Sequence, residues 1–274
     1  MLMPALGITT AVLVLLAFVR LVESRMAFFP ATGESTTPRQ LGLDYQSLSL
    51  STRDGERLHG WSLAGPAARA NILYFHGNGG NLSVWAPIVA GIARKGYAVL
   101  AFDYRGYGLS SGRPTERGLY EDVDAIVRHF WSDSRAALPV VYWGRSLGVA
   151  MAACAASVRK PDALILEAGF PDARSLLRES PLLALLSLFS SYRFPAVELL
   201  GRLGSPVPVL VIHGDNDHVV PIAKGRALYD AIATPTKQFV TIHGGDHTDA
   251  LPSEPGTYWG AVEQFVAGLA PSTR

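Results

Sequence analysis

The pentapeptide Gly144-Arg145-Ser146-Leu147-Gly148 decides which fold this sequence predicts. It directly follows the apolar run 138–143 and directly precedes the run 149–158, which favours a helix. Strand, sharp turn and helix in this order form the context in which a G-x-S-x-G pentapeptide presents its serine as a nucleophile. The turn is so tight that a side chain at either glycine would collide with the neighbouring strand or helix. Ser146 is therefore our candidate nucleophile, and the rest of the chain must supply its partners.

Outward from this turn, short apolar runs alternate with amphipathic stretches. The runs are Asn71–Phe75, Tyr97–Phe102, Pro139–Trp143, Ala163–Leu166, Val207–Ile212 and Gln238–Ile242, and the amphipathic stretches lie near 82–94, 116–131, 147–158, 222–233 and 256–268. Runs of this kind are typical of buried parallel strands. We therefore expect an α/β fold with a mostly parallel central sheet and helices on both faces. Alternating runs on either side of Asp54-Gly55 predict an antiparallel hairpin at the sheet edge.

Two loops at predicted strand ends contain the side chains that a serine nucleophile needs. A serine hydroxyl near neutral pH requires a base within hydrogen-bond reach, and the base requires an orienting carboxylate. The loops are 213–221 and 243–249. The alternatives that the residues themselves leave open are Asp215, Asp217 and Glu167 for the acid, and His243 and His247 for the base.

These motifs together resemble the α/β-hydrolase superfamily. Within it, the chain is most similar to the Bem46-like, ABHD13-like or ABHD17-like serine hydrolases with a single membrane span. The matching stretches are Tyr74–Asn81, Phe102–Gly112, the pentapeptide around Ser146, and the two loops at 213–221 and 243–249. The resemblance covers nearly the whole chain, including the amino-terminal apolar segment and the Phe-Phe-Pro that follows it.

The resemblance implies a role for each candidate. Ser146 is the nucleophile, and His247 is the general base because the family places its histidine after a Gly-Gly turn. Asp217 is the orienting acid because the family's acid lies four residues before a proline. The order Ser146, Asp217, His247 is also the order of the triad in these enzymes. Asp103, Arg105 and Ser110 are expected to have structural roles in a glycine-rich loop, and Arg145 to tie the pentapeptide to neighbouring loops.

An acyl-transfer site also needs backbone donors for the tetrahedral intermediate, an oxyanion hole. We expect one donor to be the N–H of Leu147, which opens the helix after the nucleophile. The other is the N–H of Asn78, in the loop after His76-Gly77. In the resembling family this histidine shapes the loop, so His76 is not expected to act as a base.

The amino terminus differs in kind from the rest of the chain. Residues 1–19 contain no charged side chain, and about 17–25 apolar residues are enough to cross a bilayer. Neither a preceding Lys or Arg nor a following A-x-A site supports a cleaved signal peptide. We therefore expect a transmembrane anchor at 1–25, a linker at 26–42 and a hydrolase domain at 43–270. Arg20 and Arg25 point to a cytoplasmic domain, but two arginines beside one glutamate leave the orientation open.

Residues 171–204 interrupt the alternation of strands and helices with a leucine-rich stretch at 182–189. We expect a small helical cap whose apolar face lines an acyl pocket or contacts lipid. The alternative is a helix that simply packs on the sheet.

Composition and charge reduce the number of possible partners, cofactors and classes of function. The formal net charge of +1 over 274 residues gives no reason to expect a nucleic-acid partner. The histidines lack metal-ligand spacing, so we expect neither a metal nor a cofactor, and the single Cys154 is expected to be a core filler. We therefore predict a membrane-anchored serine hydrolase of carboxylic esters or thioesters, with a small-molecule or lipid-like acyl substrate. A serine peptidase or amidase is the alternative, then a non-catalytic binding protein, and the oligomeric state stays open.

Overall fold

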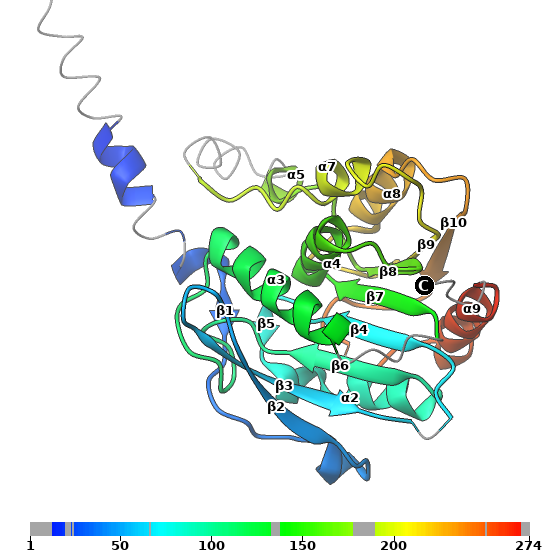
Figure 1. Ribbon diagram of the computed structural model, residues 1–274. Helices are drawn as coiled ribbons and strands as arrows, with labels where there is room; N and C mark the ends of the chain where they lie inside the picture. Colours follow the sequence, from blue (N-terminus) through cyan, green and yellow to red (C-terminus); the bar gives the residue numbers. More distant parts are fainter. Residues whose placement is uncertain are drawn as a thin grey trace, which may run out of the picture.

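The computed structural model of the chain describes residues 13–19, 23, 25–65, 67–132, 138–177, 190–249 and 251–269. Its centre is an eight-stranded sheet in the order β10-β9-β8-β7-β4-β6-β3-β2 (Figure 1). The strands are β2 (Gln46–Ser51), β3 (Arg57–Leu63), β4 (Asn71–Phe75), β6 (Ala98–Phe102), β7 (Val140–Arg145), β8 (Ala163–Glu167), β9 (Val209–Gly214) and β10 (Lys237–Ile242). This is the α/β-hydrolase fold that the sequence predicts.

The sheet is parallel from β10 to β6 and antiparallel at the β3–β2 edge. Every residue of β4, β6, β7 and β8 is buried, as continuous apolar runs require. The predicted edge hairpin is present, with Gln46 opposite Ser62 and Ser51 opposite Arg57. Because β7, β9 and β10 are parallel, their carboxyl ends lie at the same edge of the sheet, where a site can form.

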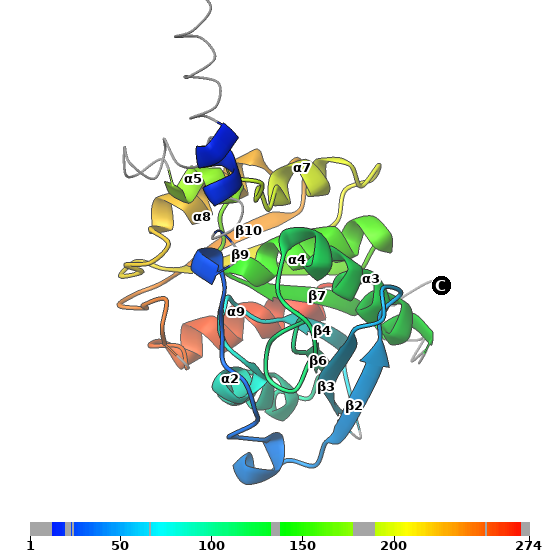
Figure 2. The same ribbon diagram turned by 90° about the vertical axis from the view of Figure 1, so that its left-hand side faces the viewer.

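Helices cover both faces of the sheet (Figures 1 and 2). They are α2 (Leu82–Arg94), α3 (Glu116–Ser132), α4 (Leu147–Val158), α5 (Ala173–Leu177), α7 (Ala196–Gly201), α8 (Ile222–Ala231) and α9 (Pro255–Ala267), with a 3-10 turn η1 (Pro38–Leu41). One core joins the sheet to α3, α4, α7 and α8, and a second joins it to α2 and α9. Cys154 is buried in the first core, where burial raises the pKa of its thiol to about 12.

The segment 26–42, which we expected to be a linker, packs against the domain. Phe29–Pro30 forms β1, which pairs in parallel with β5 (Gly79–Gly80) in a separate two-stranded sheet. Phe28 is buried, with its ring 5.3 Å from Tyr192 and 6.1 Å from Phe194 between centroids. Packing of this kind depends on contacts between distant residues, so a local composition rich in Thr, Ser, Gly and Pro does not reveal it.

Two expectations fall partly on residues outside the described ranges. Of the amino-terminal segment, residues 13–19 are helical, with Leu13, Val14 and Phe18 exposed. Across the described part of the chain, no helix is both long and apolar enough to span a membrane. Of the expected cap at 171–204, the leucine run 182–189 lies outside the described residues. α7 packs on α4 through the buried Ala196 and Leu200.

Candidate active site

The turn between β7 and α4 holds Ser146 in an unusual backbone conformation, with φ 55° and ψ −117°. Positive φ is costly for a residue with a side chain and is found mainly where the surrounding structure enforces it. A Cβ on Gly144 would lie 2.1 Å from the carbonyl oxygen of Gly148, and one on Gly148 would lie 2.0 Å from that of Phe75. Both glycines are therefore required by the close approach of α4 to β7 and β4.

Three candidate site residues come together at the carboxyl ends of β7, β9 and β10. His247 Nε2 lies 3.0 Å from Ser146 Oγ, and His247 Nδ1 lies 2.8 Å from Asp217 Oδ2. The other carboxylate oxygen of Asp217 accepts the N–H groups of Val219 at 3.0 Å and Val220 at 2.7 Å. These contacts form a continuous relay from a fixed carboxylate through an imidazole to the hydroxyl.

The charge state of Asp217 follows from its surroundings. Burial raises the pKa of this carboxyl, but hydrogen bonds from His213 and His247 outweigh burial and hold the pKa well below its ordinary value. His213 Nε2 lies 3.4 Å from Asp217 Oδ2, a contact that sequence reasoning missed. An ionised Asp217 favours the proton on Nδ1 of His247, which leaves Nε2 free to accept the Ser146 proton.

The loop that contains Asn78 passes beside Ser146. A Cβ on Gly77 would lie 3.5 Å from Ser146 Cβ, so the expected oxyanion donor Asn78 follows a residue in near contact with the serine. Leu147, the other expected donor, is the first residue of α4. Its N–H therefore lies at a helix N-terminus, where the helix dipole favours negative charge.

The His76 ring forms no hydrogen bond with Ser146 in the part of the chain that the structure describes. Its ring is buried, with Nδ1 2.7 Å from the Gly77 carbonyl and Nε2 3.5 Å from Asp103 Oδ1. Burial lowers the pKa of His76 to about 4, so the ring is neutral near pH 7. These contacts agree with a loop-shaping role.

The alternative acids and base are engaged elsewhere. Asp215 Oδ2 lies 2.8 Å from His243 Nδ1 in an exposed pair. Glu167 accepts from Arg145 at 2.9 Å, and its other oxygen accepts from Trp143 and Tyr258. Glu167 contacts Ser146 through the backbone, where its carbonyl accepts the Ser146 N–H at 2.8 Å. Neither of these side-chain pairs forms a hydrogen bond with Ser146 Oγ in the described structure.

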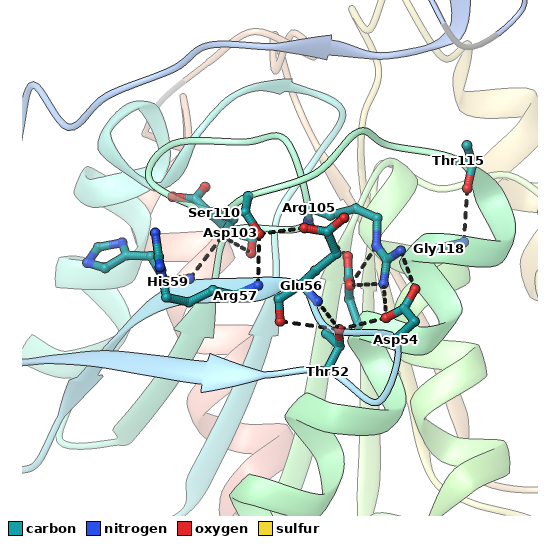
Figure 3. Close-up of polar contacts among 12 residues, drawn as sticks. Thr52, Asp54, Glu56, Arg57, His59, Asp103, Arg105, Ser110, Thr115 and Gly118 are labelled. Carbon is teal, nitrogen blue, oxygen red and sulfur yellow. Dashed lines mark hydrogen bonds and ion pairs between the residues drawn. The ribbon is translucent and has the colours of Figure 1, made fainter.

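The glycine-rich loop after β6 is tied to the β2–β3 turn (Figure 3). Arg105 donates two hydrogen bonds to Asp54, at 2.7 and 3.0 Å, and one from Nε to the buried Asp122 at 2.8 Å. Ser110 Oγ donates to the Asp103 carbonyl at 2.8 Å and accepts from the N–H of His59 at 2.9 Å. These bonds give Arg105 and Ser110 the structural role that we expected.

No group of three or more potential metal ligands occurs among the residues that the structure describes. The side chains that meet at this site offer a hydroxyl, an imidazole and a carboxylate. Such a set can form and hydrolyse an acyl-serine.

A family model described as serine aminopeptidase, S33 matches residues 66–205 and 196–251. The chain belongs to this family, within the α/β-hydrolase superfamily. It is 31% identical to the uncharacterized membrane protein YNL320W of Saccharomyces cerevisiae, over 84% of this chain and 82% of that one. It is 33% identical to the uncharacterized protein YfhR of Escherichia coli, over 81% of this chain and 79% of that one. An esterase of Pyrococcus furiosus has the same fold, with a TM-score of 0.70, 18% identity and coverage of 88% of this chain and 98% of that one.

In this α/β hydrolase, Arg145 links the turn that contains Ser146 to the loop that contains His247. Its Nη2 donates to the carbonyls of His247 and Asp249, both at 2.9 Å, while Nη1 pairs with Glu167. The guanidinium also lies over the ring of Trp85, 5.2 Å from its centroid. The sequence predicts a tie to neighbouring loops but not which loop, since His247 and Asp249 lie more than a hundred residues away.

A second feature that sequence reasoning missed is a contact from the amino-terminal segment to Asn78. The side-chain amide of Asn78 donates to the carbonyl of Ala27 at 2.7 Å. The Phe-Phe-Pro that follows Ala27 was the available signal, because it belongs to the resemblance although it lies far from the other motifs.

Proposed function

We propose that this hydrolase cleaves carboxylic esters or thioesters through an acyl-enzyme on Ser146. The observation that supports this most directly is the relay of Asp217, His247 and Ser146, with contacts of 2.8 and 3.0 Å. Ser146 Oγ attacks the carbonyl carbon while His247 Nε2 takes its proton, and Asp217 stabilises the imidazolium. His247 then protonates the leaving alcohol or thiol, and water repeats the sequence on the acyl-serine to release the acid.

The N–H groups of Asn78 and Leu147 act as the oxyanion hole in this proposal. Each donor that is aligned with the developing oxyanion contributes about 2.7–4 kcal/mol in the transition state. The position of the Asn78 loop beside Ser146 supports its part in this pair.

A serine peptidase or amidase is the second candidate function, because the matching family is described as serine aminopeptidase. The same relay serves both reactions. Ester cleavage is favoured by the printed names of several solved structures of this fold, which are esterases.

We also propose that residues 1–25 anchor a hydrolase domain, 43–270, to a membrane as a single-pass segment with the domain on the cytoplasmic side. The uncharged segment 1–19 supports the anchor, as does the printed name of the yeast relative, a membrane protein. A lipid-like acyl substrate is supported by exposed apolar side chains near the site. Leu109, Val219 and Leu251 are 48–59% exposed on loops after β6, β9 and β10. A cap at 171–204 would cover such a substrate.

Labelling with a fluorophosphonate probe and a substrate series test the reaction. We expect the native chain to label and the Ser146→Ala chain not to label. We expect turnover of p-nitrophenyl esters from acetate to palmitate to exceed that of aminoacyl p-nitroanilides. Turnover of the anilides alone would favour the peptidase, and equal labelling of both chains would contradict catalysis by Ser146. A strong preference for acetate would contradict a long acyl pocket.

A further inference from the structure

Residues 27–33, which we call the amino-terminal strap, include β1, which pairs with β5 directly after Asn78 (Figure 1). Within the strap, Phe29 and Pro30 of β1 lie opposite Gly79 and Gly80 of β5. The N–H of Ala31 donates to the Gly80 carbonyl at 2.8 Å. The strap is thus hydrogen-bonded to the residues directly after the expected oxyanion donor.

The far end of the same loop is attached to the strap by a side chain. The amide of Asn81 donates to the carbonyls of Ala31 at 3.1 Å and Gly33 at 2.8 Å. Asn81 also caps helix α2 by accepting the N–H of Ser83 at 2.9 Å. The loop is therefore held between a helix that packs on the sheet and the strap.

Two polar groups fix Asn78 itself. Its side-chain amide donates to the Ala27 carbonyl at 2.7 Å. The hydroxyl of the fully buried Tyr107 lies 2.9 Å from Asn78 Oδ1 and 3.0 Å from the Asn78 carbonyl oxygen. Burial raises the pKa of the Tyr107 hydroxyl, and the backbone N–H of Phe29 in the strap opposes this rise. Tyr107 therefore lies between the strap and the loop, at the residue that we expect to supply an oxyanion donor.

These contacts matter because the loop has little stiffness of its own. Gly77, Gly79 and Gly80 surround Asn78, and glycine has the largest backbone freedom to lose. A donor stabilises the oxyanion only when it is already aligned with the position that the charge will occupy. Misplacement of about 1 Å can reduce a rate by a hundredfold.

We propose that the amino-terminal strap and Tyr107 form a positioning element of the active site, which holds the Asn78 N–H toward the developing oxyanion. This inference rests on the proposed function. It makes residues 27–33 part of the catalytic apparatus, in addition to joining the apolar segment to the domain.

The test compares Tyr107→Phe and Asn78→Ala in the full chain, with steady-state turnover of a p-nitrophenyl ester. Both variants keep the Asn78 N–H and remove only what positions it. We expect kcat to fall about tenfold or more in each with KM unchanged, because only transition-state binding is lost. The affinity for an alkyl boronic acid, which forms a tetrahedral adduct on the serine, is expected to fall by the same factor. The double variant is expected to lose little more than either single variant.

Tyr142→Phe is the matched control. Tyr142 is also fully buried, and its hydroxyl donates to the Arg159 carbonyl at 3.0 Å, beyond the end of α4 that lies farthest from Ser146. We expect this variant to keep kcat and KM even where its melting temperature falls as much as that of Tyr107→Phe.

Unchanged kcat in both Tyr107→Phe and Asn78→Ala would overturn the inference, as would an equal fall of kcat in Tyr142→Phe. Asn78 is partly exposed, so Asn78→Ala decides the matter if Tyr107→Phe does not fold. Failure of the proposed function would look different, since the native chain itself would then show neither ester turnover nor labelling at Ser146.

Discussion

The backbone conformation that places Ser146 at the candidate site also lowers the stability of the fold. At φ 55° and ψ −117° its Cβ costs about 1–3 kcal/mol, a cost that glycine avoids. We therefore expect Ser146→Gly and Ser146→Ala to be equally inactive, with the glycine variant more stable to urea by about 1 kcal/mol. Ser157, inside the same helix α4, is the control. There the order reverses, because glycine is less favourable than alanine in a regular helix by about 1 kcal/mol. The same order at both sites would contradict strain at Ser146.

Arg145 allows stability and catalysis to be separated. Replacement by Met leaves Glu167 buried without its cation, and breaking a buried pair in this way costs about 3 kcal/mol or more. It also releases the carbonyls of His247 and Asp249. We expect Arg145→Met to lower both the unfolding free energy and kcat. The double variant with Glu167→Gln is expected to recover part of the stability and none of the kcat, as measured by urea unfolding and ester turnover.

Asp217 links stability to pH in a defined direction. Its pKa in the folded chain lies below the ordinary value of 3.8. A depressed carboxyl pKa contributes stability above the unfolded-state pKa, and this contribution is lost as pH falls toward the folded-state pKa. We expect Asp217→Asn to be less stable than the native chain at pH 7, by a difference that stays constant down to about pH 5 and shrinks below pH 3.8. Thermal melts of both chains across this range measure it, and a difference that grows on acidification would contradict the assignment.

At the scale of elements, the closeness of α4 to β4 and β7 is the feature most sensitive to substitution. Gly148→Ala would bring a Cβ within 2.0 Å of the Phe75 carbonyl, which is backbone and cannot move aside. We expect this variant to lose more than 3 kcal/mol of stability, a cost in the range of severe overpacking. Gly260→Ala in α9 has nothing within 4 Å and is expected to be neutral or slightly stabilising. Urea unfolding of the two variants provides the comparison.

Elements also show why sequence reasoning succeeds in one part of the chain and fails in another. Strand β4 and the strands from β6 to β10 could be predicted because most are continuous apolar runs that end in polar loops. β1 and β5 could not be predicted, because a two-residue parallel pair that includes two glycines has no periodicity. The candidate site could be narrowed to the loops 213–221 and 243–249 from the residues alone, and the family resemblance selects Asp217 and His247 within them. The support from His213 and Ala27 depends on contacts across space, for which a single sequence has no local signal.

At the scale of the whole molecule, the proposed anchor can be separated from the hydrolase domain. Val14→Arg with Phe18→Arg places two charges among exposed apolar side chains of the segment 13–19. Each charge opposes insertion by about 2.5–3.5 kcal/mol. We expect the native full chain to float with liposomes in a sucrose gradient and the double variant to remain at the bottom, with unchanged kcat on p-nitrophenyl acetate. Flotation of both chains would contradict anchoring by this segment.

The burial of Phe28 limits how far Ser146 can lie from a surface that binds the uncharged segment 1–19. Phe28 packs against Tyr192 and Phe194. This packing fixes the position of the chain close to the loop that passes Ser146. Val19, the last residue of the uncharged segment, is only nine residues earlier, and nine residues of fully extended chain span roughly 30 Å. A surface that binds the uncharged segment therefore keeps Phe28 within roughly 30 Å of the point where that segment ends. A scissile bond close to that surface can therefore be reached by Ser146. A scissile bond farther away has to move toward the surface first.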